Sequence, residues 1–241
     1  MSLHFEKRKT ASTAALFLVP FLSFAASLVL TALLLLAFGV NPLATFSAMF
    51  KGAFGSGRAF TETLVKAIPL MLTGLGVAFA FKLRFWNIGA EGQLVIAGVG
   101  TAWVALFWSG WMPPGLLLPV AILVGCLAGA MWAGAPAILK TSIGVDETLV
   151  TLMLNYVAIL AADSLYYGPW RDPKGFGFPG SAPFPQEAWL PRIAGRAHIG
   201  LFFALVLALI LWVVLNRTRW GFELKIIGAS PSALDAAQKS R

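Results

Sequence analysis

Long apolar stretches separated by short polar segments make up most of this chain. A transmembrane helix needs about 20 predominantly apolar residues. Six stretches approach or exceed that length, at about residues 11–39, 61–81, 86–109, 115–139, 147–168 and 198–216. The first exceeds the apolar core of a cleavable signal peptide, about 7 to 15 residues, so we expect a retained, tilted helix. The pattern therefore predicts an all-α, polytopic transmembrane helical bundle.

The segments between these stretches carry turn and loop signals. Residues 40–60 are mixed in polarity and predict an interfacial helix with a loop, whereas residues 169–197 form a loop rich in proline and glycine. The composition changes sharply after the sixth span. We therefore divide the chain into a transmembrane domain, residues 1–216, and a cytoplasmic segment, residues 217–241.

Composition and charge agree with a membrane protein. Hydrophobic residues make up 59% of the chain and charged residues only 12%, whereas soluble domains are nearer half apolar and a quarter charged. The net charge of +8 fits the positive-inside rule, because with both termini cytoplasmic eleven cations lie inside and seven outside. No basic run with interleaved aromatic residues predicts a nucleic-acid surface.

Residues that would indicate an enzyme or a metal site are sparse. Cys126 is the single cysteine and lies in an apolar run, and His4 and His198 are far apart. No spacing typical of a metal site or of a nucleophile with its base is present. The phosphate-binding pattern GxxxxGK[ST] does not occur, so this chain does not hydrolyse ATP by that route. The sequence predicts a non-catalytic protein with no metal and no bound cofactor.

Polar residues interrupt the apolar pattern most clearly in residues 81–98. Asn87, Glu91 and Gln93 lie there among glycines. One interpretation is a helix start at the cytoplasmic interface, with Asn87 as N-cap and Glu91 near the positive end of the helix dipole. The other is a polar element beside a translocation path, because ionisable residues within membranes usually face a protein interior or water. Both interpretations can hold together.

The fifth span carries a second group of polar side chains. Asp146 and Glu147 suit its N-terminus. Tyr156 and Asp163 are seven residues apart and share one helical face, where they either form a buried hydrogen-bonded pair or contact a substrate. The candidates for lining or supporting a translocation path are Asn87, Glu91, Gln93, Asn155, Tyr156 and Asp163.

Two further patterns concern helix packing. Glu62 and Lys66 have the four-residue spacing of an ion pair on one helix. The fourth span contains small residues spaced four apart, which allow another helix of the same chain to approach closely. These residues are Ala121, Gly125, Gly129 and Ala133.

Three segments, in the same order along the chain, resemble one protein family. They are residues 85–94 (FWNIGAEGQL), 144–156 (GVDETLVTLMLNY) and 220–237 (WGFELKIIGASPSALDAA). They look like the inner-membrane permease subunits of bacterial ABC importers, in the branch of simple-sugar, ribose-type and nucleoside permeases. The first two segments look closest to nucleoside-type members. The resemblance implies a permease that imports a nucleoside or a simple sugar across the bacterial inner membrane.

The resemblance also implies partners. Permeases of this family pair as two subunits, identical or different, bind two cytoplasmic ATPase subunits that use ATP, and receive substrate from an extracytoplasmic binding protein. The segment that matches residues 220–237 carries a coupling helix that docks on the ATPase. The implied docking residues are Trp220, Gly221, Gly228, Ala229, Pro231 and Ala236.

The C-terminal residues add two expectations. From the residues alone, Ser232 suits the N-cap of a short helix, with Gly221, Gly228 and Pro231 interrupting the sequence before it. Family permeases continue beyond this segment for several more spans, so the resemblance implies that this chain is C-terminally truncated.

An ion-coupled secondary transporter is the alternative function. Such transporters also use broken helices and intramembrane acids, so Glu91 and Asp163 would be its proton or sodium sites. Against it, these six spans contain no detectable inverted repeat. A membrane-embedded enzyme is weaker still, because no histidine lies near an intramembrane acid in the sequence.

Overall fold

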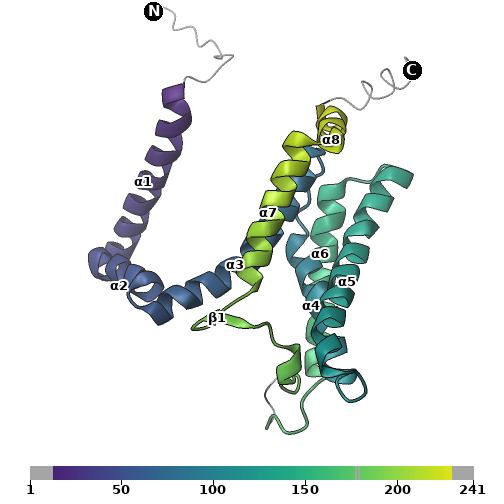
Figure 1. Ribbon diagram of the computed structural model, residues 1–241. Coiled ribbons are helices and arrows are strands. Elements are labelled where there is room, and N and C mark those ends of the chain that lie inside the picture. Colours follow the sequence, from purple (N-terminus) through teal and green to yellow (C-terminus); the bar gives the residue numbers. More distant parts are fainter. Residues whose placement is uncertain (1–12, 177, 179, 230–241) are drawn as a thin grey trace, which may run out of the picture. The chain divides into compact units, whose positions relative to one another are not determined.

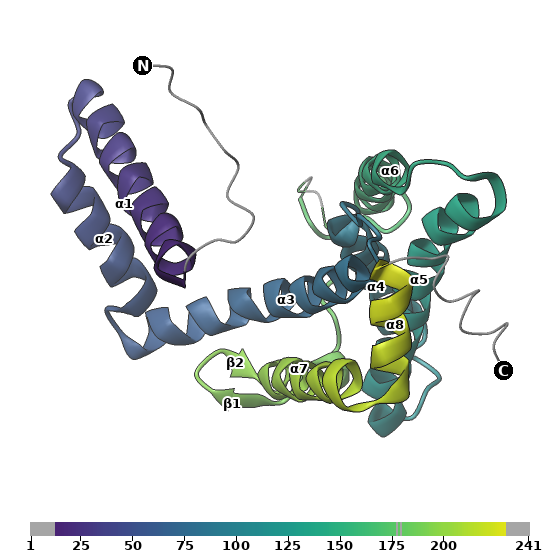
Figure 2. The ribbon, with the colours of Figure 1, turned by 90° about the horizontal axis from the view of Figure 1, so that it is seen from above.

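The computed structural model describes residues 13–176, 178 and 180–229. Within these residues the chain forms eight α-helices, one short 3-10 helix (η1) and a two-stranded hairpin, which Figures 1 and 2 show in two views. Contacts between residues divide the chain into two compact units. The first unit ends at Phe60 and the second begins at Thr61.

The first unit contains two helices joined by a tight turn. α1 (Thr13–Ala37) ends before Gly39, whose φ of 73° lies in the left-handed region that glycine adopts without strain. Asn41 then caps α2 (Pro42–Phe54), because its Oδ1 accepts two backbone N–H groups of the first turn at 3.0 and 3.2 Å. A helix in residues 40–60 was predicted, and α2 occupies that position.

The second unit holds five long helices, a short C-terminal helix and the hairpin. In chain order these are α3 (Gly57–Lys82, which begins at the end of the first unit), α4 (Ala90–Phe107), α5 (Pro114–Ile143), α6 (Glu147–Tyr167), η1 (Gln186–Ala188), β1 (Arg192–Ala194), β2 (Ala197–His198), α7 (Gly200–Arg217) and α8 (Arg219–Ala229). Among the described residues, six helices are long and apolar enough to cross a membrane, namely α1 and α3 to α7. The predicted all-α polytopic fold is therefore confirmed.

The packed core of the second unit lies where α4, α5 and α6 meet (Figures 1 and 2). Glycines let α4 and α5 approach each other closely. A Cβ atom at Gly100 would lie 2.9 Å from Cβ of Ala128, and one at Gly129 would lie 3.2 Å from Cβ of Ala97. Gly125 and Gly129 of the predicted row on α5 therefore pack against α4 within the chain.

We expect the replacement of Gly125 by valine to destabilise this core. A Cβ at position 125 would collide with Oγ1 of Thr101 and would lie 3.0 Å from the backbone oxygen of Ala97. Overpacking of this kind costs about 1–3 kcal/mol. Thermal unfolding of the purified protein should give a lower midpoint for Gly125→Val than for Gly134→Val, because a Cβ at Gly134 meets no atom within 4 Å. Equal midpoints would contradict the importance of this contact.

An ion pair ties the hairpin of the second unit to α3. β1 and β2 pair antiparallel around Gly195, whose φ is 56°. Beside it, Nη1 of Arg196 lies 2.8 Å from Oε1 of Glu62, near the start of α3. The predicted pair between Glu62 and Lys66 is therefore wrong. The hairpin brings a guanidinium to this carboxylate from 134 residues away, which helical spacing cannot indicate.

The helix ends of the second unit lie at two opposite ends of this unit. The end of α3, the start of α4, the α5–α6 turn and the α7–α8 corner lie at the upper end of this unit in Figure 1. The α6–α7 connection with its hairpin lies at the opposite end. Near the end of α4, Trp108 lies between Trp103 and Trp111, with ring centroids 5.0 and 5.4 Å apart. The upper end carries the polar segments that the sequence singled out.

Candidate functional site at the start of α4

A tight turn links the end of α3 to the segment before α4. The backbone N–H of Arg84 donates to the oxygen of Phe81, and that of Phe85 donates to the oxygen of Ala80, both at 3.1 Å, as in a Schellman motif. Arg84 occupies the left-handed position with a φ of 53°, where glycine is usual. A side chain there costs about 1–2 kcal/mol. Contacts with other helices must therefore hold this turn.

Helix α6 supplies the cap of α4. Gly89 is the N-cap residue and has no side chain with which to accept the free N–H groups of the first turn. Instead, Oδ1 of the buried Asn155 accepts the N–H of Gly92. Asn87, which the sequence predicted as N-cap, lies two residues before Gly89 and accepts its N–H at 3.1 Å. That prediction is wrong, because the capping oxygen of the first turn comes from another helix.

Asn87 and Gln93 form a closed pair of amides. Nδ2 of Asn87 donates to Oε1 of Gln93, and Nε2 of Gln93 donates to Oδ1 of Asn87, each at 3.1 Å. A primary amide has two N–H groups and two oxygen lone pairs, so these bonds leave one of each on Gln93. The pair holds Gln93 in a fixed orientation. The structure therefore brings Asn87, Gln93 and Asn155 together at one place.

Thr151 belongs to this cluster although the sequence did not single it out. Its side chain is 1% exposed, and its Oγ1 accepts the N–H of Ile88 at 3.2 Å. A Cβ at Gly89 would lie 2.6 Å from the oxygen of Thr151, and one at Gly92 would lie 2.8 Å from Cα of Asn155. These glycines let the start of α4 pack directly on α6. The four-residue spacing of Thr151 and Asn155, which puts both on one face, is the sequence signal for this surface.

A charged group lies on the other side of the turn. Nζ of Lys140, near the end of α5, lies 2.6 Å from Oε1 of Glu147, the first residue of α6. The same ammonium lies 5.2 Å from the ring centroid of Phe85, and Oε1 of Glu147 accepts the N–H of Trp86 at 3.4 Å. Charge and hydrogen bonds therefore join α5 and α6 to the segment before α4.

Asp146 caps α6, as the sequence predicted. Its Oδ1 accepts the N–H of Thr148 at 2.8 Å and that of Leu149 at 3.2 Å. The hydrogen bond from Leu149 lowers the pKa of the Asp146 carboxyl from its usual value, and Thr148 and Lys140 act in the same direction. The carboxyl is therefore ionised at neutral pH. Gly144 precedes it as the C-cap of α5, with a φ of 70°.

The other three candidates lie outside this cluster. Glu91 is in the first turn of α4, near the positive end of the helix dipole, and its side chain is exposed. Tyr156 is 58% exposed, and Asp163 is exposed as well. The prediction of a buried pair between Tyr156 and Asp163 is therefore wrong. Helical periodicity places Tyr156 and Asp163 on one face of α6, but it does not show whether that face is buried or exposed.

An open hollow of about 210 Å³ lies between α3 and α4. Gln93 lines it from α4, and Thr73 and Gly76 line it from α3. The hydroxyl of Thr73 donates to the backbone oxygen of Pro69 at 2.8 Å. The remaining lining residues are apolar: Leu72, Val77, Ala90 and Leu94.

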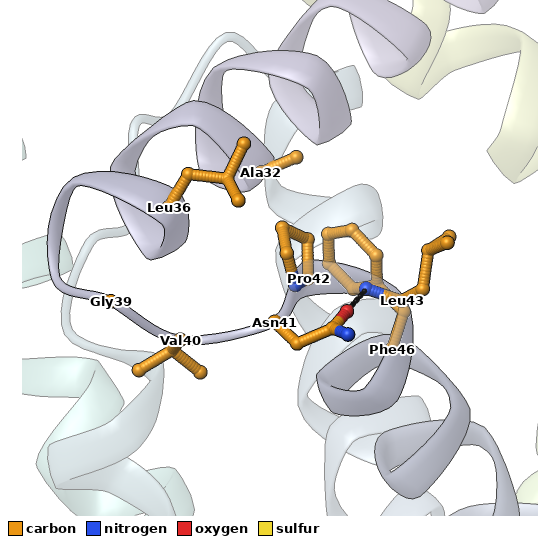
Figure 3. A pocket seen from close by; sticks show the side chains of 8 residues that line it. All are labelled: Ala32, Leu36, Gly39, Val40, Asn41, Pro42, Leu43 and Phe46. Atoms are coloured by element: carbon orange, nitrogen blue, oxygen red, sulfur yellow. Dashed lines mark hydrogen bonds between the residues drawn. The ribbon is translucent and has the colours of Figure 1, made fainter.

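A larger hollow, of about 650 Å³, lies in the first unit at the corner between α1 and α2 (Figure 3). Its lining is almost wholly apolar, and Leu36, Leu43 and Phe46 contribute to it. The one amide there, Asn41, is engaged as the cap of α2, and Figure 3 shows its bond to Leu43. This hollow therefore lacks the free polar groups that a site for a hydrophilic solute needs.

The chain becomes helical again directly after α7. Oγ1 of Thr218 accepts the N–H of Gly221 at 3.2 Å and so caps α8. Gly221 and Gly228 were expected to interrupt the sequence before a short helix, but both lie within α8. Pro231, Ala236 and the helix expected from Ser232 lie outside the described residues.

Both glycines of α8 are buried and mark its contacts. A Cβ at Gly221 would lie 2.5 Å from the oxygen of Leu215 in α7, and one at Gly228 would collide with the oxygen of Lys82 at the end of α3. Trp220, by contrast, is 74% exposed. α8 therefore meets α3 at the turn that leads into α4.

These features define a polytopic α-helical membrane protein with a polar cluster at the start of α4. The chain belongs to the family described as branched-chain amino acid transport system / permease component, which it matches over residues 59–238. The match begins within α3, so α1 and α2 precede it. No solved structure matches the chain significantly.

Several curated relatives are named as ABC transporter permeases. The chain is 35% identical to a glucose ABC transporter permease protein of Haloferax volcanii, covering 100% of this chain and 66% of the relative. It is 33% identical to a guanosine ABC transporter permease protein of Bacillus subtilis, covering 92% of this chain and 64% of the relative. For a nucleoside ABC transporter permease protein of Lactococcus lactis the identity is 30%, covering 91% of this chain and 63% of the relative. The chain thus spans less than two thirds of the length of these relatives.

Proposed function

We propose that this chain is a transmembrane permease subunit of an ABC importer that moves a nucleoside or a simple sugar across the bacterial inner membrane. The observation that carries the proposal is the proximity of three family-like segments: the first packs on the second, and the described part of the third packs on the residues directly before the first. The start of α4 packs on α6 through Thr151 and Asn155, and α8 packs on the end of α3 through Gly228. The names of the three relatives support the substrate class.

In this function the polar cluster lies beside the translocation path. Asn87, Gln93 and Asn155 supply neutral hydrogen-bonding groups within apolar sequence, which suits a path for an uncharged solute. Glu91, Tyr156 and Asp163 remain candidates for lining the path from the exposed faces of α4 and α6.

The partners follow from the same proposal. Lys82 ends α3, Arg84 follows it directly, Lys140 lies near the end of α5 and Arg219 begins α8, so the positive-inside rule favours this end of the second unit as the cytoplasmic end. ATPase subunits bind there, on the segment that contains α8, and they hold the ATP. A second permease, identical or different, completes the path, and a binding protein delivers substrate at the opposite end. This chain itself is non-catalytic and binds no cofactor.

Uptake in cells, with ATP and the ion gradients controlled separately, tests this function. We expect cells that express the complete transporter to accumulate labelled guanosine or glucose while ATP is maintained, even when ionophores collapse the proton and sodium gradients. Depletion of ATP should stop uptake. If collapse of the gradients stops uptake while ATP is maintained, the ion-coupled alternative with Glu91 and Asp163 is correct instead.

A further inference from the structure

The hollow between α3 and α4 combines free space with two polar groups of fixed position. Asn87 orients the amide of Gln93, which keeps one N–H and one lone pair free. Across the hollow, the Thr73 hydroxyl donates to Pro69, and its oxygen keeps lone pairs that accept hydrogen bonds. The two groups together offer both donor and acceptor capacity.

Glycine at position 76 keeps the α3 side of this hollow open. A Cβ there would meet no atom within 4 Å, so no packing contact accounts for the absence of a side chain. The same holds for Gly74, which does not line the hollow. On a helix, residues 74 and 76 point about 200° apart. Gly76 therefore faces the hollow, whereas Gly74 faces elsewhere.

The lining residues also restrict the chemistry of an occupant. None of the seven residues that line the hollow carries a charge. A zwitterionic amino acid placed there would find no charged partner among the lining residues, and unpaired charges are unfavourable beside apolar groups. A neutral solute with several hydroxyl groups needs donors and acceptors only, and a primary amide supplies both.

We infer that this hollow contacts the sugar ring of the transported solute. Gln93 is the hydrogen-bonding residue and Asn87 is its positioning residue. The absence of a side chain at Gly76 leaves space for the ring. The inference rests on the proposed function, in which the solute is a nucleoside or a simple sugar. The sugar ring is the chemistry that these two classes share. A branched-chain amino acid, as in the family description, does not fit this lining.

A matched pair of variants tests the inference. In the complete transporter reconstituted in lipid vesicles, Gly76→Leu fills the hollow, while Gly74→Leu adds the same side chain to the same helix outside it. Labelled guanosine and labelled glucose identify the solute, and ATP hydrolysis by the partner subunits reports an intact assembly. We expect Gly76→Leu to lower uptake by about tenfold or more, as lost pocket complementarity does. Uptake by Gly74→Leu and ATP hydrolysis by both variants should stay near those of the unmodified protein.

The uptake results separate a failure of the inference from a failure of the proposed function. Equal uptake by Gly76→Leu and Gly74→Leu, with transport by the unmodified protein intact, would overturn the inference and leave the proposed function standing. Uptake of labelled leucine that Gly76→Leu blocks and Gly74→Leu preserves would overturn the choice of a neutral solute. If the unmodified transporter carries none of these solutes, the proposed function is wrong and the inference falls with it.

Discussion

Replacement of Asn155 by leucine is expected to destabilise the start of α4 and, in the proposed function, to stop transport. Asn155 supplies the oxygen that accepts the buried N–H of Gly92, and leucine has a similar volume but no acceptor. A buried donor left unsatisfied costs about 1–3 kcal/mol. Water does not replace the lost oxygen easily, because Gly92 is buried against Asn155 and Ala158.

Thermal unfolding and hydrogen exchange measure this effect. The midpoint of unfolding should fall for Asn155→Leu, and the amide hydrogens at the start of α4 should exchange faster. Met153→Leu is the matched control, since Met153 is 58% exposed on the same helix and should leave both unchanged. Unchanged exchange at Gly92 in Asn155→Leu would contradict the assignment of Asn155 as the cap of α4.

The spanning helices were predictable because a bilayer imposes a constraint that local sequence records. Each span must supply enough consecutive apolar residues and satisfy its own backbone hydrogen bonds, and both conditions are met within one stretch. The capping of α6 by Asp146 was also predictable from local sequence, because the donors and the acceptor lie within three residues of each other.

Contacts between distant segments were not predictable in this way. Asn87 has the residue type and position of a cap for α4, yet the acceptor for Gly92 lies 63 residues away on α6. Glu62 has a lysine at helical spacing, yet its partner is Arg196 on the hairpin. In both cases a local rule named a chemically suitable partner, and tertiary structure supplied another that the rule could not include.

The glycines were visible as a local sequence pattern, but the contacts that they allow between distant segments were not. The small-residue row on α5 indicated that a helix packs there but not which one, and Gly100 of α4 proves to be the partner surface. Gly89 and Gly92, which lie among the polar residues of this segment, bring the start of α4 onto α6. The polar cluster thus depends on backbone approaches that only glycine permits. Asn87, Gln93 and Asn155 could be named from sequence, but Thr151 and the meeting of these residues could not.

Replacement of Gly228 by leucine is expected to detach α8 from α3 and, in the proposed function, to uncouple transport from ATP hydrolysis. Even a Cβ at this position would collide with the backbone oxygen of Lys82, and a backbone atom cannot rotate away. Overpacking costs about 1–3 kcal/mol, which lowers the equilibrium constant for docking of α8 by about 5- to 150-fold. The displaced contact lies directly before the Arg84 turn that leads to Asn87, so movement of α8 would no longer reach the polar cluster.

Uptake and ATP hydrolysis, measured together in the complete transporter, distinguish this effect from misfolding. Gly228→Leu should lose uptake while the protein remains in the membrane with an unchanged unfolding midpoint of the α4 to α6 core. Lys225→Met is the matched control, because Lys225 is exposed on the same helix and its ammonium donates to the side-chain oxygen of Asn216 at 3.2 Å. Normal uptake by Gly228→Leu would mean that α8 does not transmit movement through α3. Coupling would then have to pass through the corner at Gly221, where α8 meets α7.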